Sequence, residues 1–308
     1  MSARLRDIAK QTEEIVERGR YTAPGGREVS IAAAVAEAAE RTGMFGPEPV
    51  PVPDVACGEA ATVFEVTGES SLEAARRLVG AGPGPVAVLD FASARNPGGG
   101  YLNGAQAQEE ALCRASALYT CLLRAPEYYA HHRAEADAFY SDRVIHSPGV
   151  PVFRDDRGTL LDEPYRVGFL ASPAPNAGVI ARRTPEEVDR VPGALFARAE
   201  RVLEVAAAHG YRALVLGAWG CGVFRNDPAV VADVFRAHLA DGGRFAGRFA
   251  HVVFAVLDRR SDSPTRAAFH RAFAELARPR PAPSGGDGAG RARRGGPPEA
   301  RRCLRLRG

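Results

Sequence analysis

Two adjacent glutamates follow a glycine-rich run, and together these residue types could bind an anion and transfer a proton. The run NPGGG spans Asn96 to Gly100, and seven residues separate it from Gln108, Glu109 and Glu110. Glycine N–H groups can approach a ligand closely, and beside the start of a helix they suit a pyrophosphate. Successive helix residues project about 100° apart, so the two carboxylates are expected to do different jobs.

A second glycine-containing segment could cover a ligand. Gly220, Cys221, Gly222, Val223 and Phe224 follow an expected strand that ends near residue 218. The two glycines again permit close backbone approach, and the phenylalanine ring could stack on a planar base, a contact worth about 1–3 kcal/mol. No histidine lies near Cys221 in the sequence, which favours a small buried thiol over a nucleophile.

Each of these signals has a purely structural alternative. The glycine run could be a flexible connector, and Glu109 and Glu110 could simply favour a helix N-terminus through its dipole. Phe224 could be an ordinary core residue. Taken singly, these residues leave a ligand site and a structural role both open.

The elements that must position these residues alternate between strands and helices. Ser70 and Glu73 form an S-x-x-E capping box, and Pro126 is expected to end the long helix that carries the glutamates. Strands are expected at residues 61–67, 85–92, 143–147, 165–171, 212–218 and 251–257, and helices at residues 3–18, 28–42, 70–79, 105–124, 185–209, 228–240 and 264–277. The alternation predicts an α/β domain with helices on both faces of the sheet.

Composition and charge exclude several classes of protein. The net charge is +3, and eight arginines against two acidic residues give residues 279–308 a charge of 8 − 2 = +6, which leaves 3 − 6 = −3 for the rest. The body is therefore not a basic nucleic-acid platform. The five cysteines include no CxxC pair, which indicates neither a zinc site nor a disulfide framework. No long apolar run occurs, so a cytoplasmic protein is expected.

The order and spacing of these segments resemble one enzyme family. NPGGG-x7-QEE resembles the GGG-x(6–8)-QEE signature of poly(ADP-ribose) glycohydrolases, and WGCGVFRNDP resembles the ligand loop of their bacterial-type branch. RYTAPGGREV, VFEVTGESSLEAARRL, SPGVPVFRDD and SPAPNAG are also similar to that branch. The resemblance extends to about residue 277 and, unlike any single segment, is specific.

The resemblance implies a fold and a domain organisation. It implies a macrodomain-like three-layer α/β/α fold with a mixed central sheet and an N-terminal helical extension. Residues 1–48 would form the extension, residues 49–278 the catalytic domain, and residues 279–308 a disordered tail rich in Arg, Gly and Pro.

The resemblance also implies roles for individual residues. Glu110 matches the catalytic glutamate, and Glu109 matches the neighbour that holds the ribose at the cleaved bond. Gln108 would fix the catalytic loop, and Phe224 would lie against the adenine. Asn96 with Gly98, Gly99 and Gly100 would surround the distal ribose and the diphosphate, which Gly220, Cys221, Gly222, Val223 and Phe224 would cover. Asp90 receives no role.

The activity implied is hydrolysis of ribose–ribose O-glycosidic bonds, mainly from the polymer end, with release of ADP-ribose. No cofactor and no metal are expected, and the partners would be poly(ADP-ribose), ADP-ribose and poly(ADP-ribosyl)ated proteins of a bacterial cell, without DNA-specific or membrane binding. Two alternatives stay open: a macrodomain that binds ADP-ribose without cutting, and a hydrolase of mono-ADP-ribosylated proteins or small ADP-ribosyl substrates.

Overall fold

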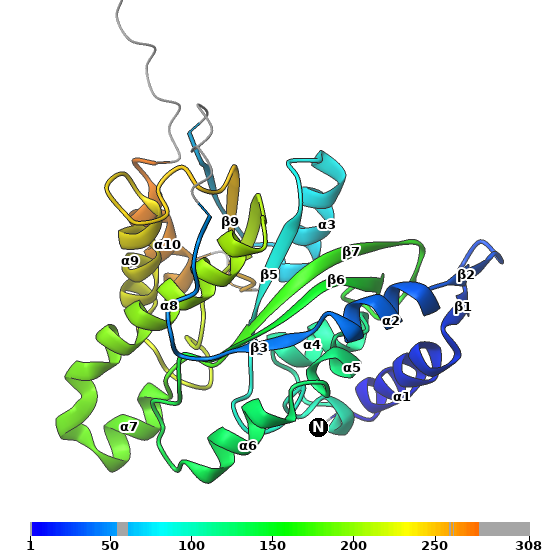
Figure 1. Cartoon of the computed structure of the whole chain (residues 1–308), viewed down its shortest axis with the longest axis horizontal. Coiled ribbons are helices and arrows are strands. Elements are labelled where there is room, and N and C mark those ends of the chain that lie inside the picture. Colours follow the sequence, from blue (N-terminus) through cyan, green and yellow to red (C-terminus); the bar gives the residue numbers. More distant parts are fainter. Residues whose placement is uncertain (1, 54–60, 259, 261, 277–308) are drawn as a thin grey trace, which may run out of the picture. The chain divides into compact units, whose positions relative to one another are not determined.

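The structure is a computed structural model that describes residues 2–53, 61–258, 260 and 262–276 (Figure 1). The expected tail, residues 279–308, lies outside the described residues, as does the end of the proline-rich connector. The boundaries predicted for the extension and the catalytic domain stay predictions.

A seven-stranded mixed sheet is the centre of the described part of the chain. Its strands are β3 (Gly43–Phe45), β4 (Val63–Thr67), β5 (Val86–Phe91), β6 (Val144–Arg154), β7 (Leu160–Ser172), β8 (Ala213–Leu216) and β9 (His251–Ala255). They are arranged in the order β3-β6-β7-β5-β8-β9-β4. From β7 to β4 all neighbours are parallel, whereas β6 and β3 add antiparallel pairs at one edge.

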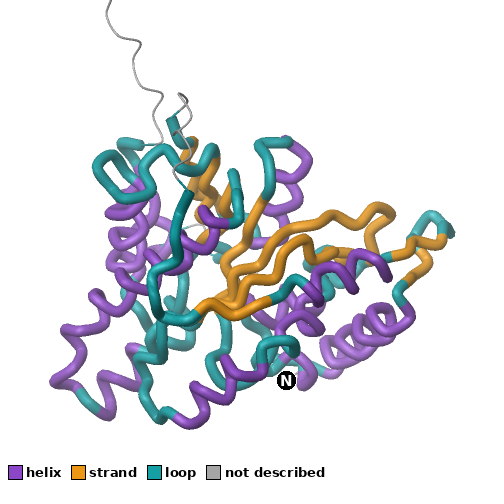
Figure 2. Tube along the Cα trace, in the orientation of Figure 1, coloured by secondary structure: helices purple, strands orange, loops and turns teal. Residues whose placement is uncertain are grey.

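Helices cover both faces of this sheet (Figure 2). They are α1 (Ala3–Arg18), α2 (Ala32–Glu40), α3 (Ser71–Ala81), α4 (Gln108–Ala115), α5 (Leu118–Leu122), α6 (Pro126–Ala134), α7 (Ala177–Arg183), α8 (Val191–Ala208), α9 (Pro228–Leu239) and α10 (Pro264–Phe273), with short 3₁₀ helices η1 (Tyr101–Asn103) and η2 (Pro185–Arg190). Strand β5 alternates between two buried clusters, with Val86 and Val88 in one and Ala87 and Leu89 in the other. Because both faces of the strand are covered, it reads as a nearly continuous apolar run. The predicted three-layer α/β/α fold with a mixed sheet is confirmed.

The long helix predicted for residues 105–124 is wrong. Helix α4 ends at Ala115 because Ser116 turns to extended backbone and forms an isolated bridge with Val152 of β6. The Ser116 hydroxyl donates to the Leu112 carbonyl and accepts the Leu118 N–H. Pro126, which was expected to end the helix, instead opens α6, where its missing N–H costs nothing.

Smaller differences concern the edges of other elements. The helix expected at residues 28–42 begins only at residue 32, because a short hairpin of β1 (Arg20–Thr22) and β2 (Glu28–Ser30) precedes it. The first six residues of the helix expected at 185–209 form the 3₁₀ helix η2. The predicted capping box is present: the Ser70 hydroxyl accepts the Glu73 N–H at 3.0 Å, and the Glu73 carboxylate accepts the Ser70 N–H at 2.9 Å.

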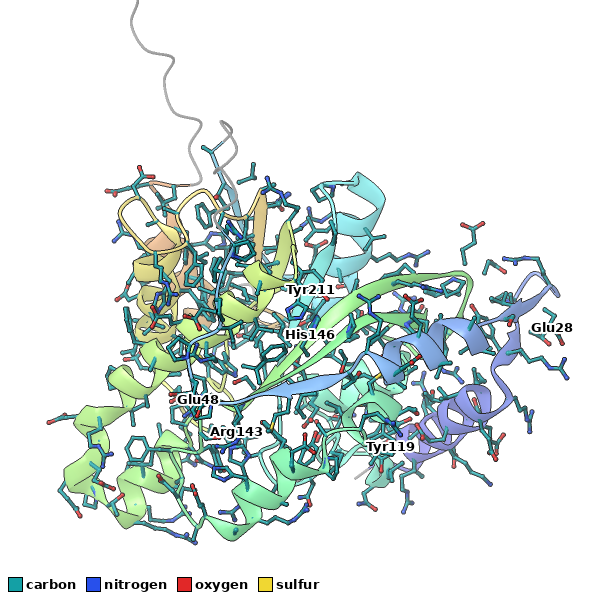
Figure 3. The ribbon with its side chains drawn as sticks, in the orientation of Figure 1. Glu28, Glu48, Tyr119, Arg143, His146 and Tyr211 are labelled. Atoms are coloured by element: carbon teal, nitrogen blue, oxygen red, sulfur yellow. The ribbon has the colours of Figure 1, made fainter. Side chains whose placement is uncertain are left out.

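A buried polar pair joins the antiparallel edge to the parallel strands. His146 of β6 lies 2.8 Å from the Tyr211 hydroxyl, measured from Nε2, and Tyr211 precedes β8 (Figure 3). Both side chains are buried. Each polar atom therefore has the partner that its burial requires.

Candidate active site

The glycine run forms a tight loop that packs against both glutamates. Gly98 and Gly99 have positive φ values of 63° and 56°, which other residues rarely adopt. A Cβ atom on Gly99 would lie 2.6 Å from Oε1 of Glu110 and 3.0 Å from Oε2 of Glu109. The glycine therefore serves close approach to the two carboxylates, and the loop is not a loose connector.

Glu110 is held between the glycine loop and the start of α4. Its Oε1 accepts the Gly100 N–H at 2.9 Å, and its Oε2 accepts the N–H of Ala107, the helix N-cap, at 2.9 Å. The side chain is buried. A glutamate at the third position of a helix commonly makes the bond to the N-cap, whereas the bond to Gly100 fixes Glu110 beside the glycine loop.

Glu109 points to a different group of atoms. Its Oε2 accepts the Ser93 N–H at 2.8 Å, in the loop after β5, and the residue is 3 % exposed. Burial and the Asp90 carboxyl raise the pKa of Glu109, while the N–H groups of Ser93 and Gly98 lower it. The adjacent glutamates thus have separate partners, as the angle between successive helix residues predicts.

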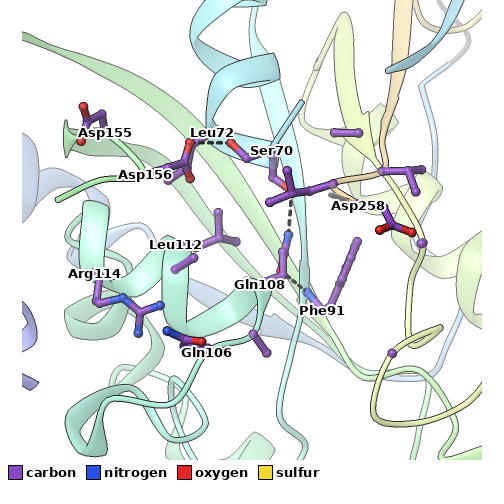
Figure 4. A pocket seen from close by; sticks show the side chains of 18 of the residues that line it. Ser70, Leu72, Phe91, Gln106, Gln108, Leu112, Arg114, Asp155, Asp156 and Asp258 are labelled. Atoms are coloured by element: carbon purple, nitrogen blue, oxygen red, sulfur yellow. Dashed lines mark hydrogen bonds between the residues drawn. The ribbon is translucent and has the colours of Figure 1, made fainter. Parts of the chain in front are cut away.

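Gln108 fastens the start of α4 to the sheet. Its Oε1 accepts the Phe91 N–H at 2.9 Å, and its Nε2 donates to the Leu89 carbonyl at 2.8 Å and to the Ser71 hydroxyl at 3.1 Å. Figure 4 shows this side chain between helix α4 and the end of β5. One amide therefore satisfies backbone groups on both sides of residue 90.

A cavity of about 570 Å³ lies beside these residues (Figure 4). Its walls include the carboxyl ends of β5, β8 and β9, where ligands of open α/β sheets usually bind. Gln108, Cys221 and Gly222 are the predicted site residues that line it, together with Phe91, Val256 and Asp258. Leu5 and Ile8 of α1 also line it.

The second glycine segment forms the loop after β8. Gly220 has a positive φ of 68°, and a Cβ there would lie 2.5 Å from that of Ala174. Gly222 faces open space, and Val223 is 84 % exposed. This loop therefore presents backbone and one apolar side chain to solvent, as a ligand cover would.

Phe224 and Cys221 have more buried surroundings. The Phe224 ring centroid lies 6.0 Å from that of Tyr140, and its carbonyl accepts the Gly178 N–H at 2.9 Å. Phe224 is not among the residues that line the 570 Å³ cavity, so its contact with adenine stays a prediction. Burial raises the pKa of the Cys221 thiol to about 12, which disfavours the reactive thiolate.

Asn96 lies at the exposed start of the glycine loop. Its N–H donates to the Ser93 hydroxyl at 3.2 Å, and its carbonyl accepts the Gly99 N–H at 3.0 Å. These bonds shape the turn that brings Gly98 and Gly99 against α4. The predicted ligand contact of the Asn96 side chain stays a prediction.

Helix α1 is bound to the same loop, which the sequence did not predict. The Tyr101 hydroxyl lies 2.9 Å from Oε1 of Glu13 and 3.1 Å from the Ala9 carbonyl, and its one proton is shared between these two acceptors. The Thr12 hydroxyl donates to the Arg114 carbonyl at 2.8 Å. The N-terminal helix therefore supports both ends of the segment that carries the glutamates.

Asp90 lies near Glu110, and the sequence indicated no role for it. It is fully buried in β5, and burial followed by the Glu110 charge raises its pKa well above the ordinary value. An acidic residue inside the apolar run PVAVLDFA was the available signal.

Among the described residues, no cluster of His, Cys, Asp and Glu is arranged to hold a metal ion. In that same part of the chain, no helix is long and apolar enough to cross a membrane.

Comparison with known proteins identifies the class to which this fold and site belong. The microbial-type catalytic domain of poly(ADP-ribose) glycohydrolase matches residues 9–155. No curated protein matches the chain. The chain belongs to the bacterial poly(ADP-ribose) glycohydrolases, a family of macrodomain-like glycosidases, on the strength of this match and of the solved structures that follow.

Solved structures of two bacterial enzymes are similar over most of the chain. Poly(ADP-ribose) glycohydrolase from Thermomonospora curvata is 54 % identical, with a TM-score of 0.82 over 88 % of this chain and 100 % of that one. The same enzyme bound to the inhibitor ADP-HPD has a TM-score of 0.80 at 55 % identity and the same coverage. The enzyme from Deinococcus radiodurans in complex with ADP-ribose is 46 % identical, with a TM-score of 0.72 over 79 % of this chain and 98 % of that one.

Proposed function

We propose that this protein hydrolyses the ribose–ribose O-glycosidic bonds of poly(ADP-ribose) and releases ADP-ribose. The observation that carries the proposal is the position of Glu110, which two backbone N–H groups fix beside the glycine loop. Family relatives supply the substrate class, since one is solved with ADP-ribose and another with ADP-HPD. ADP-ribose would lie with its diphosphate between the two glycine loops.

Glu110 would act as both acid and base. Glycosidic bonds break through an oxocarbenium-like transition state, and the departing ribose hydroxyl needs a proton. Glu110 donates that proton and then accepts one from the attacking water. Glu109 is its neighbour on one helix and faces Ser93, so the two carboxylates do not flank the bond as in the usual glycosidase pair.

Glu109 would hold the ribose at the cleaved bond. Gln108 would keep both glutamates in place by bonding the start of α4 to the backbone of β5. The substrate diphosphate would stabilise the positive charge that develops on the ribose. This mechanism uses no metal, so turnover is expected to be equal with and without a chelator. Loss of turnover in a chelator would contradict it.

We propose mainly exo action, from the end of the polymer. Helix α1 lies against the loop that follows the glycine run, since the Ser2 N–H donates to the Gly104 carbonyl at 3.1 Å. Leu5 and Ile8 of the same helix line the cavity. A continuing polymer chain would meet this helix, whereas a terminal ADP-ribose would not.

The lengths of the products test the direction of cutting. With long polymer as substrate, exo action releases ADP-ribose from the first turnovers while the remaining polymer shortens gradually. Early appearance of mid-length fragments would contradict exo action without affecting the glycohydrolase assignment. A singly ADP-ribosylated protein serves as the comparison substrate, and equal rates on both would contradict preference for the polymer.

The expected partners are poly(ADP-ribose) and poly(ADP-ribosyl)ated proteins, and the expected compartment is the cytoplasm of a bacterial cell. Free thiols are typical of reducing compartments, and Cys113, Cys121 and Cys221 are free. Fractionation of cells that express the tagged full-length protein tests the location. Recovery in a membrane or secreted fraction would contradict it.

A further inference from the structure

Asp90 is a buried acid of β5 that lies near Glu110. On β5 it follows Val86 and Val88 in the alternation, so its side chain projects toward the face that α3 and α4 cover. It is 0 % exposed. Neither of its carboxylate oxygens has a hydrogen-bond partner among the described residues.

The hydrogen bonds of α4 place Asp90 beneath the catalytic glutamates. Gln108 bonds to the backbone on either side of it, at Leu89 and Phe91. Glu109 bonds to Ser93, three residues further on. The start of α4 is therefore fixed over residue 90 from both sides.

The ionisable groups that interact electrostatically with Asp90 would make a charge there costly. They are Glu109, Glu110 and Cys113 from α4 and Tyr128 and Tyr129 from α6. All five are neutral or negative, so none offsets a carboxylate. A buried carboxylate without a donor is strongly disfavoured, and neighbouring acids disfavour it further.

Burial is the first cause that raises the pKa of Asp90, and the Glu110 charge is the second. Glu109 differs because it accepts a backbone hydrogen bond from Ser93. That hydrogen bond favours the charged form of Glu109, whereas the Asp90 carboxylate accepts none among the described residues, so ionisation is less favoured at Asp90.

We propose that Asp90 is neutral in the active enzyme, and that its ionisation sets the alkaline limit of catalysis. This inference rests on the proposed glycohydrolase function. Ionisation would place a negative charge beneath Glu109 and Glu110 and beside the site of the anionic diphosphate. The repulsion would displace the glutamates and lower turnover while the fold persists.

Asp90→Asn tests this directly because an amide has the shape of a protonated carboxyl and does not titrate. The measurement is kcat and KM for ADP-ribose release across pH. Below the alkaline limit of the wild type, the variant is expected to have kcat within about twofold of the wild type. One pH unit above that limit it is expected to be about tenfold more active than the wild type. An unchanged alkaline midpoint would overturn the proposal, as would loss of kcat at every pH.

Asp233→Asn is the matched control, since Asp233 is exposed on α9 and is not among the residues that line the cavity. It should have the wild-type profile. A shift of the same size in this variant would overturn the assignment of the effect to Asp90.

Unfolding midpoints separate the failure of this proposal from failure of the proposed function. The folded-state pKa of Asp90 is raised, so its contribution to stability is full below its ordinary pKa and is lost as pH rises through the folded-state value. Asp90→Asn should therefore unfold at higher urea than the wild type, with a margin that grows as pH rises. Equal or lower midpoints at alkaline pH would contradict a neutral Asp90, even if neither protein cleaved polymer.

Discussion

At the scale of single residues, the site depends on two adjacent glutamates with separate backbone partners. Glu110 is held by Gly100 and Ala107, and Glu109 is held by Ser93. The bonds to the glycine loop explain why glycine occurs there, since a side chain on Gly99 would collide with both carboxylates. Glycine at position 99 is therefore required by the positions of the two carboxylates.

Replacing Glu109 with Ala should lower turnover by about 100-fold, because a misplaced ribose no longer presents its bond to Glu110. Affinity for ADP-ribose should change much less. The measurement is kcat on polymer beside the Kd of ADP-ribose. Glu127→Ala, at an exposed position of α6, is the control and should behave as the wild type. A Glu109→Ala variant with unchanged kcat would remove the positioning role.

The sequence predicted these glutamates and the glycines because their order and spacing are specific. The sequence indicated no role for Asp90. An acidic residue in an apolar strand can lie at an exposed edge, pair with a basic residue or be buried in its neutral form. Only the three-dimensional structure distinguishes these cases, through zero exposure and the absence of a partner among the described residues. The role proposed for Asp90 thus depends on its burial, which the residue type alone does not predict.

At the scale of elements, helix α1 supports the segment that carries Glu109 and Glu110. Tyr101 is fully buried and joins the loop to Glu13, while Thr12 bonds to the end of α4 through Arg114. Burial raises the pKa of Glu13, and its hydrogen bond with Tyr101 lowers it. The buried hydrogen bond between Tyr101 and Glu13 therefore stabilises the loop more than an exposed hydrogen bond would.

Tyr101→Phe should destabilise the protein by about 1–3 kcal/mol, because it leaves the Glu13 carboxylate without that donor. It should also lower kcat, since the loop that begins with Gly100 loses its anchor. Urea unfolding and turnover on polymer measure the two effects. Tyr165→Phe removes a hydroxyl bonded to the Leu72 carbonyl at 3.0 Å and serves as a comparison outside the loop. Equal kcat in both variants would contradict a specific effect on the catalytic loop.

The sequence predicted most strands and helices, since apolar runs and the Ser70 capping box are local signals. It missed the end of α4 at Ser116, because that end depends on a bridge to Val152 across the sheet. It also missed β3, whose three residues are strand only through pairing with β6. Elements fixed by distant partners carry little signal in their own residues.

At the scale of the whole molecule, buried histidines lower the stability of the fold as pH falls, and buried acids lower it as pH rises. Burial lowers the pKa of His146 to about 3 and that of His132 to about 4. Burial raises the pKa of Asp90 and of Glu109. Folding thus favours neutral forms of both kinds of group.

The stability that the buried histidines contribute should fall as pH decreases from about 6.5 toward 4, while Asp90 and Glu109 act in the opposite direction. A histidine whose folded-state pKa is depressed contributes its full share above its unfolded pKa of about 6.5, and that share is lost as pH falls. Urea midpoints of the wild type and of His146→Gln at pH 7, 6 and 5 isolate the contribution of this histidine. Between pH 7 and pH 5 the wild type should lose more stability than the variant. The same change in midpoint between pH 7 and pH 5 in both proteins would contradict a neutral buried His146.

The central claim is that Glu110 cleaves poly(ADP-ribose) as acid and base. Release of free ADP-ribose from automodified poly(ADP-ribosyl)ated protein, by wild type and by Glu110→Gln without added metal, tests it most directly. We expect release by the wild type and almost none by the variant, while both bind ADP-ribose with Kd values within a few-fold. Equal release by both, or binding by both without release by either, would contradict the claim; the second result would make the protein a reader of ADP-ribose.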